Sequence, residues 1–226
     1  MAGPPLVSTD AERAAGIINL KARIRERLLV SRPSESLEEW RLLGLTAEET
    51  REFRPFFPAD PVPAAVLVPI VDRPTGLTVL LTQRASHLKN HAGQISCPGG
   101  RIEATDSGPV AAALREAREE IGLDSSFIDV VGCLPDHLIV SGYRVTPIVG
   151  FVKPDFELAL DHGEVVEAFE VPLVHILDPA NRKPRIRHFG ERAVQFLDIP
   201  YGDREIWGAT AGMLLTFHRL IVGDHP

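Results

Sequence analysis

The sequence lacks the features that mark several classes of protein. It has two cysteines, Cys97 and Cys133, which is too few for a disulfide scaffold or a cysteine-rich metal site. Its formal net charge of −7 argues against non-specific binding to nucleic acid. No apolar run approaches the roughly 18 residues of a membrane span, and residues 1–16 do not resemble a secretory signal. We therefore expect a cytoplasmic protein with reduced thiols that binds neither nucleic acid nor membrane.

The rest of the composition is that of an ordinary globular protein. Hydrophobic residues make up 44% of the 226 residues and charged residues 24%, so the chain can bury one sizeable core. Apolar residues recur at helical spacing from Ile17 to Leu28 and predict an amphipathic helix over about 10–30. Prolines then interrupt the chain. We interpret 1–62 as a helical N-terminal arm and 63–226 as the main domain.

Runs of β-branched and apolar residues predict the strands of the main domain. They cover 64–71, 77–83, 127–134, 143–152 and 165–173, followed by a late hairpin around Glu191 and a last helix over 206–222. Strands and helices are mixed along the chain, so we expect an α/β or α+β fold with a mixed sheet.

One predicted helix, over about 109–121, carries an unusual cluster of charge. Pro109 suits its first turn and Gly122 its C-terminal exit. Helical geometry gives it a narrow apolar stripe and, on the other side, three carboxylates. The stripe consists of Val110, Leu114, Ala117 and Ile121, and the carboxylates are Glu116, Glu119 and Glu120.

The carboxylates have two interpretations. They could form a solvated helix face, with Arg115 and Glu119 as an i,i+4 ion pair. Clustered carboxylate oxygens also suit a hard cation such as Mg²⁺ or Mn²⁺, which can hold water and substrate phosphates. The Gly99–Gly100 turn upstream lets the backbone approach a ligand closely. Together these features favour metal-assisted hydrolysis of a phosphate ester or anhydride.

The segment from Gly99 to Leu123 resembles the Nudix box. "REAREEIGL" matches its second half at every specified position, whereas Asp106 stands where the family usually has Glu and one extra residue separates Gly100 from Arg115. The resemblance implies a Nudix α/β/α sandwich with a mixed sheet and an N-terminal helical extension. It also implies roles for individual residues: Glu116 and Glu120 hold Mg²⁺ or Mn²⁺, Glu119 holds metal or activates water, Arg115 orients the carboxylates, and Gly99 offers a backbone carbonyl to the metal.

"LLTQRASHLKNHAGQISCPGG", residues 80–100, is similar to the signature of the coenzyme A pyrophosphatase branch of Nudix hydrolases. Lys89 replaces an arginine of that pattern and Cys97 a phenylalanine. Lysine keeps the charge but lacks the planar fork of arginine. The resemblance makes Arg84, Lys89, Gly93 and Gly100 candidates for substrate binding.

The general base has several candidates. Glu119 is the local one, and Nudix enzymes often recruit a carboxylate from a distant loop, for which Glu164 and Glu167 are the candidates here. A strand edge that faces solvent explains these two residues equally well.

The implied reaction is divalent-metal-dependent hydrolysis of coenzyme A or its thioesters, giving 3′,5′-ADP and 4′-phosphopantetheine or its acyl form. One alternative is a Nudix hydrolase for another nucleoside diphosphate derivative, such as ADP-ribose or a dinucleotide. Another is a catalytically weak Nudix domain that senses a metabolite. The partner in each case is a small molecule, and the resemblance also allows a homodimer.

Overall fold

A computed structural model describes residues 10–34, 41–42, 51, 53–54, 57–88, 91–139, 141–189 and 192–223. Its α-helices are α1 (Asp10–Leu28), α3 (Pro109–Ile121), α4 (Leu173–Leu177) and α5 (Gly208–His218), and a π-helical turn, Arg219–Gly223, follows α5. None of the helices among these residues combines the length and the apolar character needed to cross a membrane.

In the part of the chain that the structure describes, nine strands form the larger sheet, in which parallel and antiparallel pairs are mixed. The central pair, β2 (Val62–Arg73) and β8 (Tyr143–Val152), is parallel, and β2 pairs antiparallel with β3 (Gly76–Arg84). The other strands are β1 (Arg41–Leu42), β4 (Ile95–Ser96), β5 (Gly99–Arg101), β6 (Ile128–Cys133), β7 (His137–Leu138) and β9 (Val165–Pro172). A smaller antiparallel sheet contains β10 (Lys183–Phe189), β11 (Arg192–Tyr201) and β12 (Arg204–Ile206).

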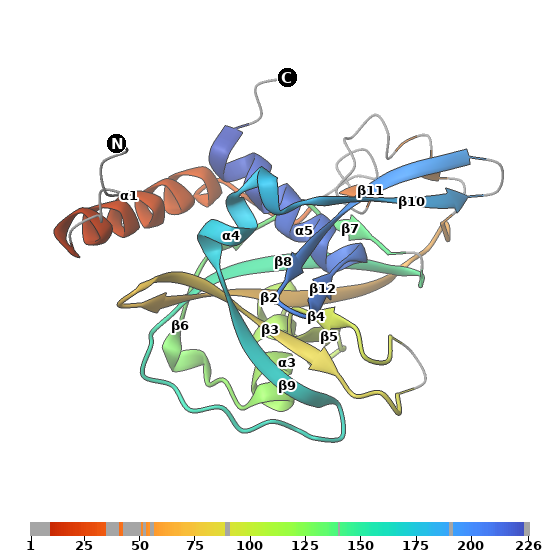
Figure 1. The fold of residues 1–226 in the computed structure, drawn as a ribbon. Helices are drawn as coiled ribbons and strands as arrows, with labels where there is room; N and C mark the ends of the chain where they lie inside the picture. The colour runs from red at the N-terminus through yellow and green to blue at the C-terminus, as the bar shows by residue number, and fades with distance from the viewer. Residues whose placement is uncertain are drawn as a thin grey trace, which may run out of the picture.

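Helices cover both faces of the larger sheet (Figure 1). On one face, residues of α1, α4 and α5 share a core cluster with the sheet, represented by Ile24, Ile176 and Phe217. On the other face, α3 packs through a second cluster that includes Ala117 and Ile121. The predicted α/β/α arrangement with a mixed sheet is therefore confirmed.

The strands and helices expected from the sequence are present, with shifted ends. The predicted helix over 10–30 ends at Leu28, and the predicted last helix over 206–222 divides into α5 and the π-helical turn. The late hairpin is β10 and β11, which pair antiparallel. Among the described residues, five strands of two or three residues each had no recognisable apolar run: β1, β4, β5, β7 and β12. Such short segments are held by pairing to longer strands rather than by their own pattern.

The buried face of α3 differs from the predicted stripe. Val110 is 42% exposed and Leu114 is partly exposed, whereas Ala112, Ala113 and Glu120 are buried beside Ala117 and Ile121. Small alanines allow the helix to lie close to β2 and β5, which it contacts. The prediction that all three glutamates lie on the side away from the core was therefore wrong for Glu120.

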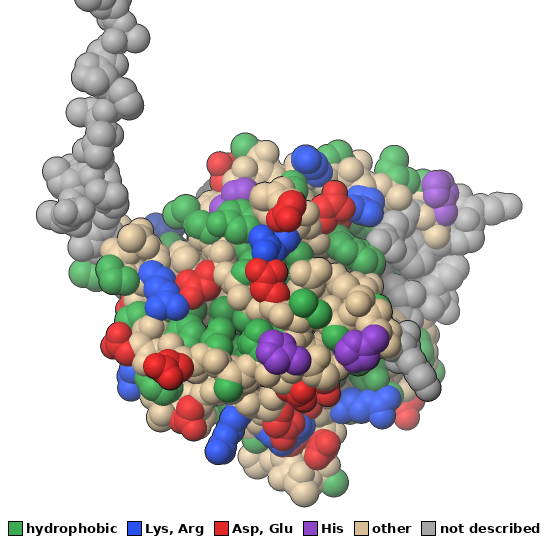
Figure 2. Space-filling view, turned by 60° about the horizontal axis from the view of Figure 1, so that its bottom comes forward, with side chains coloured by type: hydrophobic (Ala, Val, Ile, Leu, Met, Phe, Trp, Pro, Cys, Tyr) green, Lys and Arg blue, Asp and Glu red, His purple; other side chains and the backbone are tan. Residues whose placement is uncertain are grey.

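Charged side chains of both signs are intermingled on the face shown in Figure 2. On this face, Lys and Arg are not gathered into the cluster that binding to a nucleic-acid backbone requires.

The N-terminal helix α1 packs against β3, β6 and the C-terminal π-helical turn. Ile24 and Leu28 are 0% and 1% exposed and belong to the main core cluster. Arg25 forms an ion pair with Asp129 of β6 at 2.5 Å. The boundary at residue 62 stays a prediction, but α1 shares its core with the sheet.

We predict that Ile24→Ala lowers the free energy of unfolding by about 2–4 kcal/mol, because it removes buried methyl groups from a packed cluster. Ile18→Ala is the matched control, since Ile18 lies on the same helix and is 65% exposed. It should change stability by less than about 0.5 kcal/mol. Urea denaturation measures both, and an Ile24→Ala effect as small as the control would show that α1 is not part of the cooperative fold.

Candidate active site

The Gly99–Gly100 strand brings the backbone against the carboxylate helix. Within β5, Gly100 pairs with Ala65 and Gly99 with Val66 of β2. A Cβ atom on Gly99, whose φ is +157°, would lie 2.4 Å from the carbonyl oxygen of Ala65. A Cβ atom on Gly100 would lie 2.4 Å from Oε1 of Glu116. The two glycines therefore serve different contacts, one with the sheet and the other with a carboxylate of α3.

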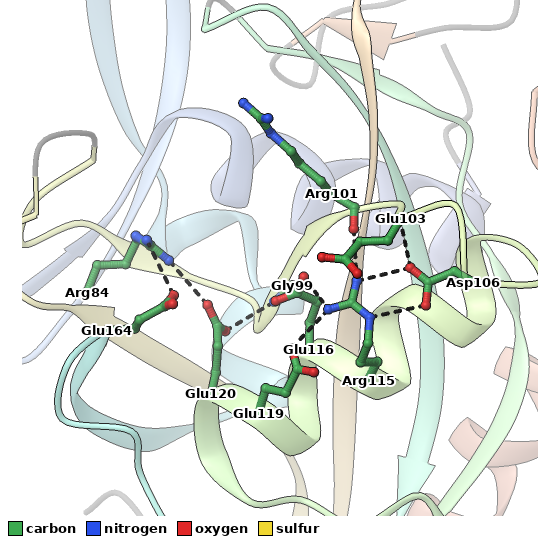
Figure 3. A network of polar contacts seen from close by, with 10 residues as sticks. All are labelled: Arg84, Gly99, Arg101, Glu103, Asp106, Arg115, Glu116, Glu119, Glu120 and Glu164. Atoms are coloured by element: carbon green, nitrogen blue, oxygen red, sulfur yellow. Dashed lines mark hydrogen bonds and ion pairs between the residues drawn. The ribbon is translucent and has the colours of Figure 1, made fainter.

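Glu120 is a buried acid at the junction of three elements (Figure 3). Glu120 is 3% exposed. One carboxylate oxygen accepts a hydrogen bond from the backbone N–H of Gly99 at 3.1 Å, and the other lies 3.2 Å from Nη1 of Arg84 on β3. Burial raises the pKa of Glu120 to about 7, although Gly99 and Arg84 both favour the charged form. The site thus holds a carboxylate whose charge is incompletely compensated.

Arg115 connects the remaining carboxylates. Its guanidinium donates to Asp106 at 3.0 and 3.1 Å, to Glu116 at 2.8 Å and to Glu119 at 2.9 Å. It also donates to the carbonyl oxygen of Arg101 at 3.0 Å. Hydrogen bonds from Arg115 and from the backbone of Glu103 hold the pKa of Asp106 below its usual range. Asp106, in the loop before α3, therefore anchors the arginine that orients the helix carboxylates.

Burial also raises the pKa of Glu116, and the charge of Arg115 opposes this shift. Glu116 and Glu120 are one helical turn apart. The like charges of Glu116 and Glu164 add to the rise in the pKa of Glu120, and those of Glu119 and Glu164 add to the rise in the pKa of Glu116. Glu119 is 59% exposed at its side chain. The three predicted carboxylates therefore differ in exposure: Glu120 is buried, Glu116 is partly exposed and Glu119 is exposed.

The distant candidates for the general base are in different places. Glu164 lies in the turn before β9, and its carboxylate is 3.9 Å from Nη2 of Arg84, beside Glu120 (Figure 3). Glu167 instead accepts hydrogen bonds from Arg204 of β12 at 2.7 and 2.9 Å. The structure thus joins Glu164 to the carboxylate helix through Arg84, and holds Glu167 in a separate ion pair.

The candidate substrate loop follows Arg84. Gly93 has a φ of +69°, and its N–H donates to the carbonyl oxygen of Arg84 at 3.1 Å, so it closes the turn that returns the chain to β4. Gly100 lies at the carboxylate helix, as described above. Lys89 lies outside the described residues.

A large cleft opens beside this cluster. Its volume is about 1290 Å³, and it extends from Arg84 and the Gly99–Gly100 strand to the C-terminal segments of the chain. The far wall is lined by Ile186, Phe196, Trp207, Thr210 and Met213. Sequence reasoning missed this wall and also missed Arg101 and Tyr143 at the cleft. No sequence spacing connects β10, β11 and α5 with the carboxylate helix, because their proximity arises only from the fold.

The carboxylates fit a divalent cation by their chemistry. Glu116 and Glu120 provide hard oxygen donors from one helix, and their raised pKa values show that more positive charge would stabilise them. Among the described residues, no three His, Cys, Asp or Glu side chains are grouped closely enough to hold a metal ion. Arg115 and Arg84 now bind the carboxylate oxygens, so cation binding requires these side chains to exchange partners.

We predict that Glu120→Gln stabilises the metal-free protein at pH 8. The ordinary pKa of a glutamate carboxyl is about 4.5, and burial in the folded protein raises the pKa of Glu120 to about 7. The stability from its protonated form is therefore present below about pH 4.5 and is lost as pH rises through about 7. The variant should be about 1–2 kcal/mol more stable than the wild type at pH 8, and about equal to it at pH 5.

Urea unfolding with a chelator at both pH values measures this difference. A variant that is less stable than the wild type at pH 8 would contradict the prediction, because it would show that the Arg84–Glu120 attraction exceeds the cost of burying the charge.

Cys97 lines the cleft but is not a credible nucleophile. It is 2% exposed, and burial raises its thiol pKa to about 12, with a further contribution from the charge of Glu120. Since the thiolate is the reactive form, we predict that Cys97→Ala and Cys133→Ala retain turnover within about threefold. Loss of all turnover in a folded Cys97→Ala protein would indicate covalent catalysis.

Comparison with known proteins identifies the family. The NUDIX domain family matches residues 61–192, more than half of the chain. The uncharacterized Nudix hydrolase NudL of Escherichia coli K12 is 44% identical over 153 residues, which cover 67% of this chain and 78% of NudL. Among solved structures, a MutT/nudix family protein from Enterococcus faecalis has a TM-score of 0.46 at 13% identity, covering 80% of this chain and 71% of its own. A C. elegans Ap4A hydrolase has a TM-score of 0.43 at 19% identity, covering 49% and 80%. The family match and the identity to NudL show that this chain belongs to the Nudix family and is a hydrolase.

Proposed function

We propose that the protein hydrolyses the diphosphate bond of coenzyme A or its thioesters to 3′,5′-ADP and 4′-phosphopantetheine or its acyl form. Family membership supports hydrolysis of a pyrophosphate bond in a nucleoside diphosphate derivative, and Nudix hydrolases generally need divalent metal ions. The observation that carries the proposal is the buried, incompletely compensated carboxylate of Glu120 at the edge of a large cleft. The proposed metal is Mg²⁺ or Mn²⁺.

Glu116 and Glu120 would hold the cation, with Glu119 and the carbonyl oxygen of Gly99 as further ligands. When bound, such an ion polarises a phosphoryl oxygen and lowers the pKa of a bound water. Arg115 keeps the glutamates oriented through its bonds to Asp106 and to the Arg101 carbonyl. Gly100 leaves the space that the Glu116 carboxylate occupies. These contacts hold the carboxylates together beside β5 before a cation binds, and cation binding would then exchange some of the contacts with Arg115 and Arg84.

Two carboxylates outside the most buried pair are candidates for the general base. Glu119 is exposed on α3, and Glu164 lies across from Glu120 beside Arg84. Either could accept a proton from a water, since both side chains are exposed to solvent. Glu167 is a weaker candidate because Arg204 holds its carboxylate.

In this proposal, Arg84 changes partners when metal and substrate bind. Without metal, its guanidinium compensates Glu120 and Glu164. A cation held by Glu120 would leave the guanidinium available to a substrate diphosphate, which arginine binds through paired hydrogen bonds. Arg84 lines the cleft, as this role requires.

The choice of coenzyme A rests on the segment 80–100 and on the size of the cleft. This segment runs from β3 through the loop to β5 and supplies Arg84, Gln94, Cys97 and Gly99 to the cleft lining. The cleft volume of about 1290 Å³ exceeds the usual range for small-ligand sites. The extra volume suits a long substrate such as coenzyme A, which extends on both sides of its diphosphate. Lys89 in the same segment stays a candidate for a phosphate contact. A cytoplasmic location and a homodimer also remain proposals.

The decisive assay is a panel of diphosphates with Mg²⁺ and with Mn²⁺. Coenzyme A and its thioesters should be cleaved with a higher kcat/KM than ADP-ribose or a dinucleotide. Preference for ADP-ribose would contradict the coenzyme A assignment and leave the Nudix reaction in place. Binding without turnover on any member of the panel would instead indicate a metabolite sensor.

We predict that Glu120→Gln lowers kcat on the best substrate by at least about 100-fold, because it removes a charge that metal binding requires. Glu26→Gln is the matched control, since Glu26 is exposed on α1, and it should keep wild-type turnover. Circular dichroism confirms that both variants fold. Near-normal turnover of Glu120→Gln would rule out its role as a metal ligand.

A further inference from the structure

Arg101 connects the carboxylate cluster with the cleft. It ends β5, directly after Gly100, and its backbone carbonyl accepts a hydrogen bond from Arg115 at 3.0 Å. Its side chain lines the cleft, and Figure 3 shows it extending away from Arg115 and the glutamates. Arg115, which orients the carboxylates, thus also holds the backbone from which the Arg101 side chain projects.

Tyr143 holds the Arg101 guanidinium in place. The Nε and Nη2 atoms of Arg101 donate to the phenol oxygen of Tyr143 at 3.0 and 2.9 Å, and the guanidinium carbon lies 5.5 Å from the ring centroid. Tyr143 begins β8, beside the central strand β2, and also lines the cleft. Contact with an aromatic ring restricts the guanidinium without neutralising it.

Arg101 differs from the other arginines of the site in how its charge is compensated. Arg84 and Arg115 are both paired with carboxylates. In the part of the chain that the structure describes, no carboxylate forms an ion pair with Arg101. A preoriented guanidinium that lines a cleft and has no carboxylate partner among the described residues is suited to an anionic group of the ligand.

We propose that Arg101 binds a phosphate of the substrate other than the diphosphate that is cleaved, and that in coenzyme A this is the 3′-phosphate of the ribose. The inference rests on the proposed function. The cleaved diphosphate has to lie at Glu116, Glu120 and Arg84, whereas the Arg101 side chain points away from those carboxylates (Figure 3). Coenzyme A carries one further phosphate, and Arg101 is therefore a specificity residue with Tyr143 as its positioning residue.

The test compares coenzyme A with dephospho-coenzyme A, which lacks the 3′-phosphate. Arg101→Gln should lower kcat/KM for coenzyme A by about 10- to 100-fold, the range of a charged hydrogen bond, and change dephospho-coenzyme A by less than about twofold. Arg101→Lys should recover part of the loss, since it restores the charge without the fork. Tyr143→Phe should also lower kcat/KM for coenzyme A more than for dephospho-coenzyme A, but by a smaller factor and mainly through KM.

Two controls separate this role from others. Arg23→Gln removes an exposed arginine of α1 and should leave both substrates unchanged. Arg84→Ala should lower activity on both substrates by similar factors, because it acts on the shared diphosphate. Calorimetry with adenosine 3′,5′-bisphosphate and with AMP gives a readout without turnover, and Arg101→Gln should weaken only the bisphosphate.

Equal losses on both substrates in Arg101→Gln, or no loss on either, would overturn the assignment of Arg101. A wild type that cleaves coenzyme A without preferring it over dephospho-coenzyme A would also contradict it, while leaving the proposed function intact. A wild type that does not cleave coenzyme A would instead refute the proposed function itself.

Discussion

The burial of one carboxylate shapes the rest of the site. Glu120 lies under β5 at the edge of the sheet, where charge is costly, and its neighbours reduce that cost without removing it. The N–H of Gly99 and the guanidinium of Arg84 each satisfy one oxygen. A protein selected for stability alone would place a neutral residue here. The remaining negative charge is the physical reason to expect a cation at this position.

The arginines around the site differ in the groups that compensate their charge. Arg115 is saturated by carboxylates and orients them, Arg84 compensates Glu120 and Glu164, and Arg101 lines the cleft over the ring of Tyr143. The same short strand, β5, connects all three, because Gly99 contacts Glu120, Gly100 makes room for Glu116, and the Arg101 carbonyl binds Arg115. The carboxylates of α3 and the arginine that lines the cleft are therefore connected through three consecutive residues of β5.

Much of this architecture follows from the sequence, and the reasons for the failures are physical. Helix α3 runs over Pro109–Ile121 as predicted, since Pro109 and Gly122 are strong end signals. Its buried face includes Ala117 and Ile121 as predicted, but Val110 and Leu114 were assigned to it wrongly, because close packing on the sheet uses alanines. Periodicity also cannot predict that Glu120 is buried, since this depends on the long-range contact with Gly99. Arg101 and the far wall of the cleft likewise depend on tertiary contacts between segments distant in the sequence.

The central claim is that the Glu120 cluster binds a divalent cation, and direct measurement of binding tests it without any assumption about substrate. Calorimetric titration of the metal-free protein with Mn²⁺ at pH 8 should show saturable binding to the wild type. The affinity of Glu120→Gln should fall by at least about tenfold, since the variant lacks the charge of a ligand. Proton release should accompany binding near pH 7, where Glu120 is partly protonated. Equal Mn²⁺ affinity in the wild type and in the folded variant would contradict the account.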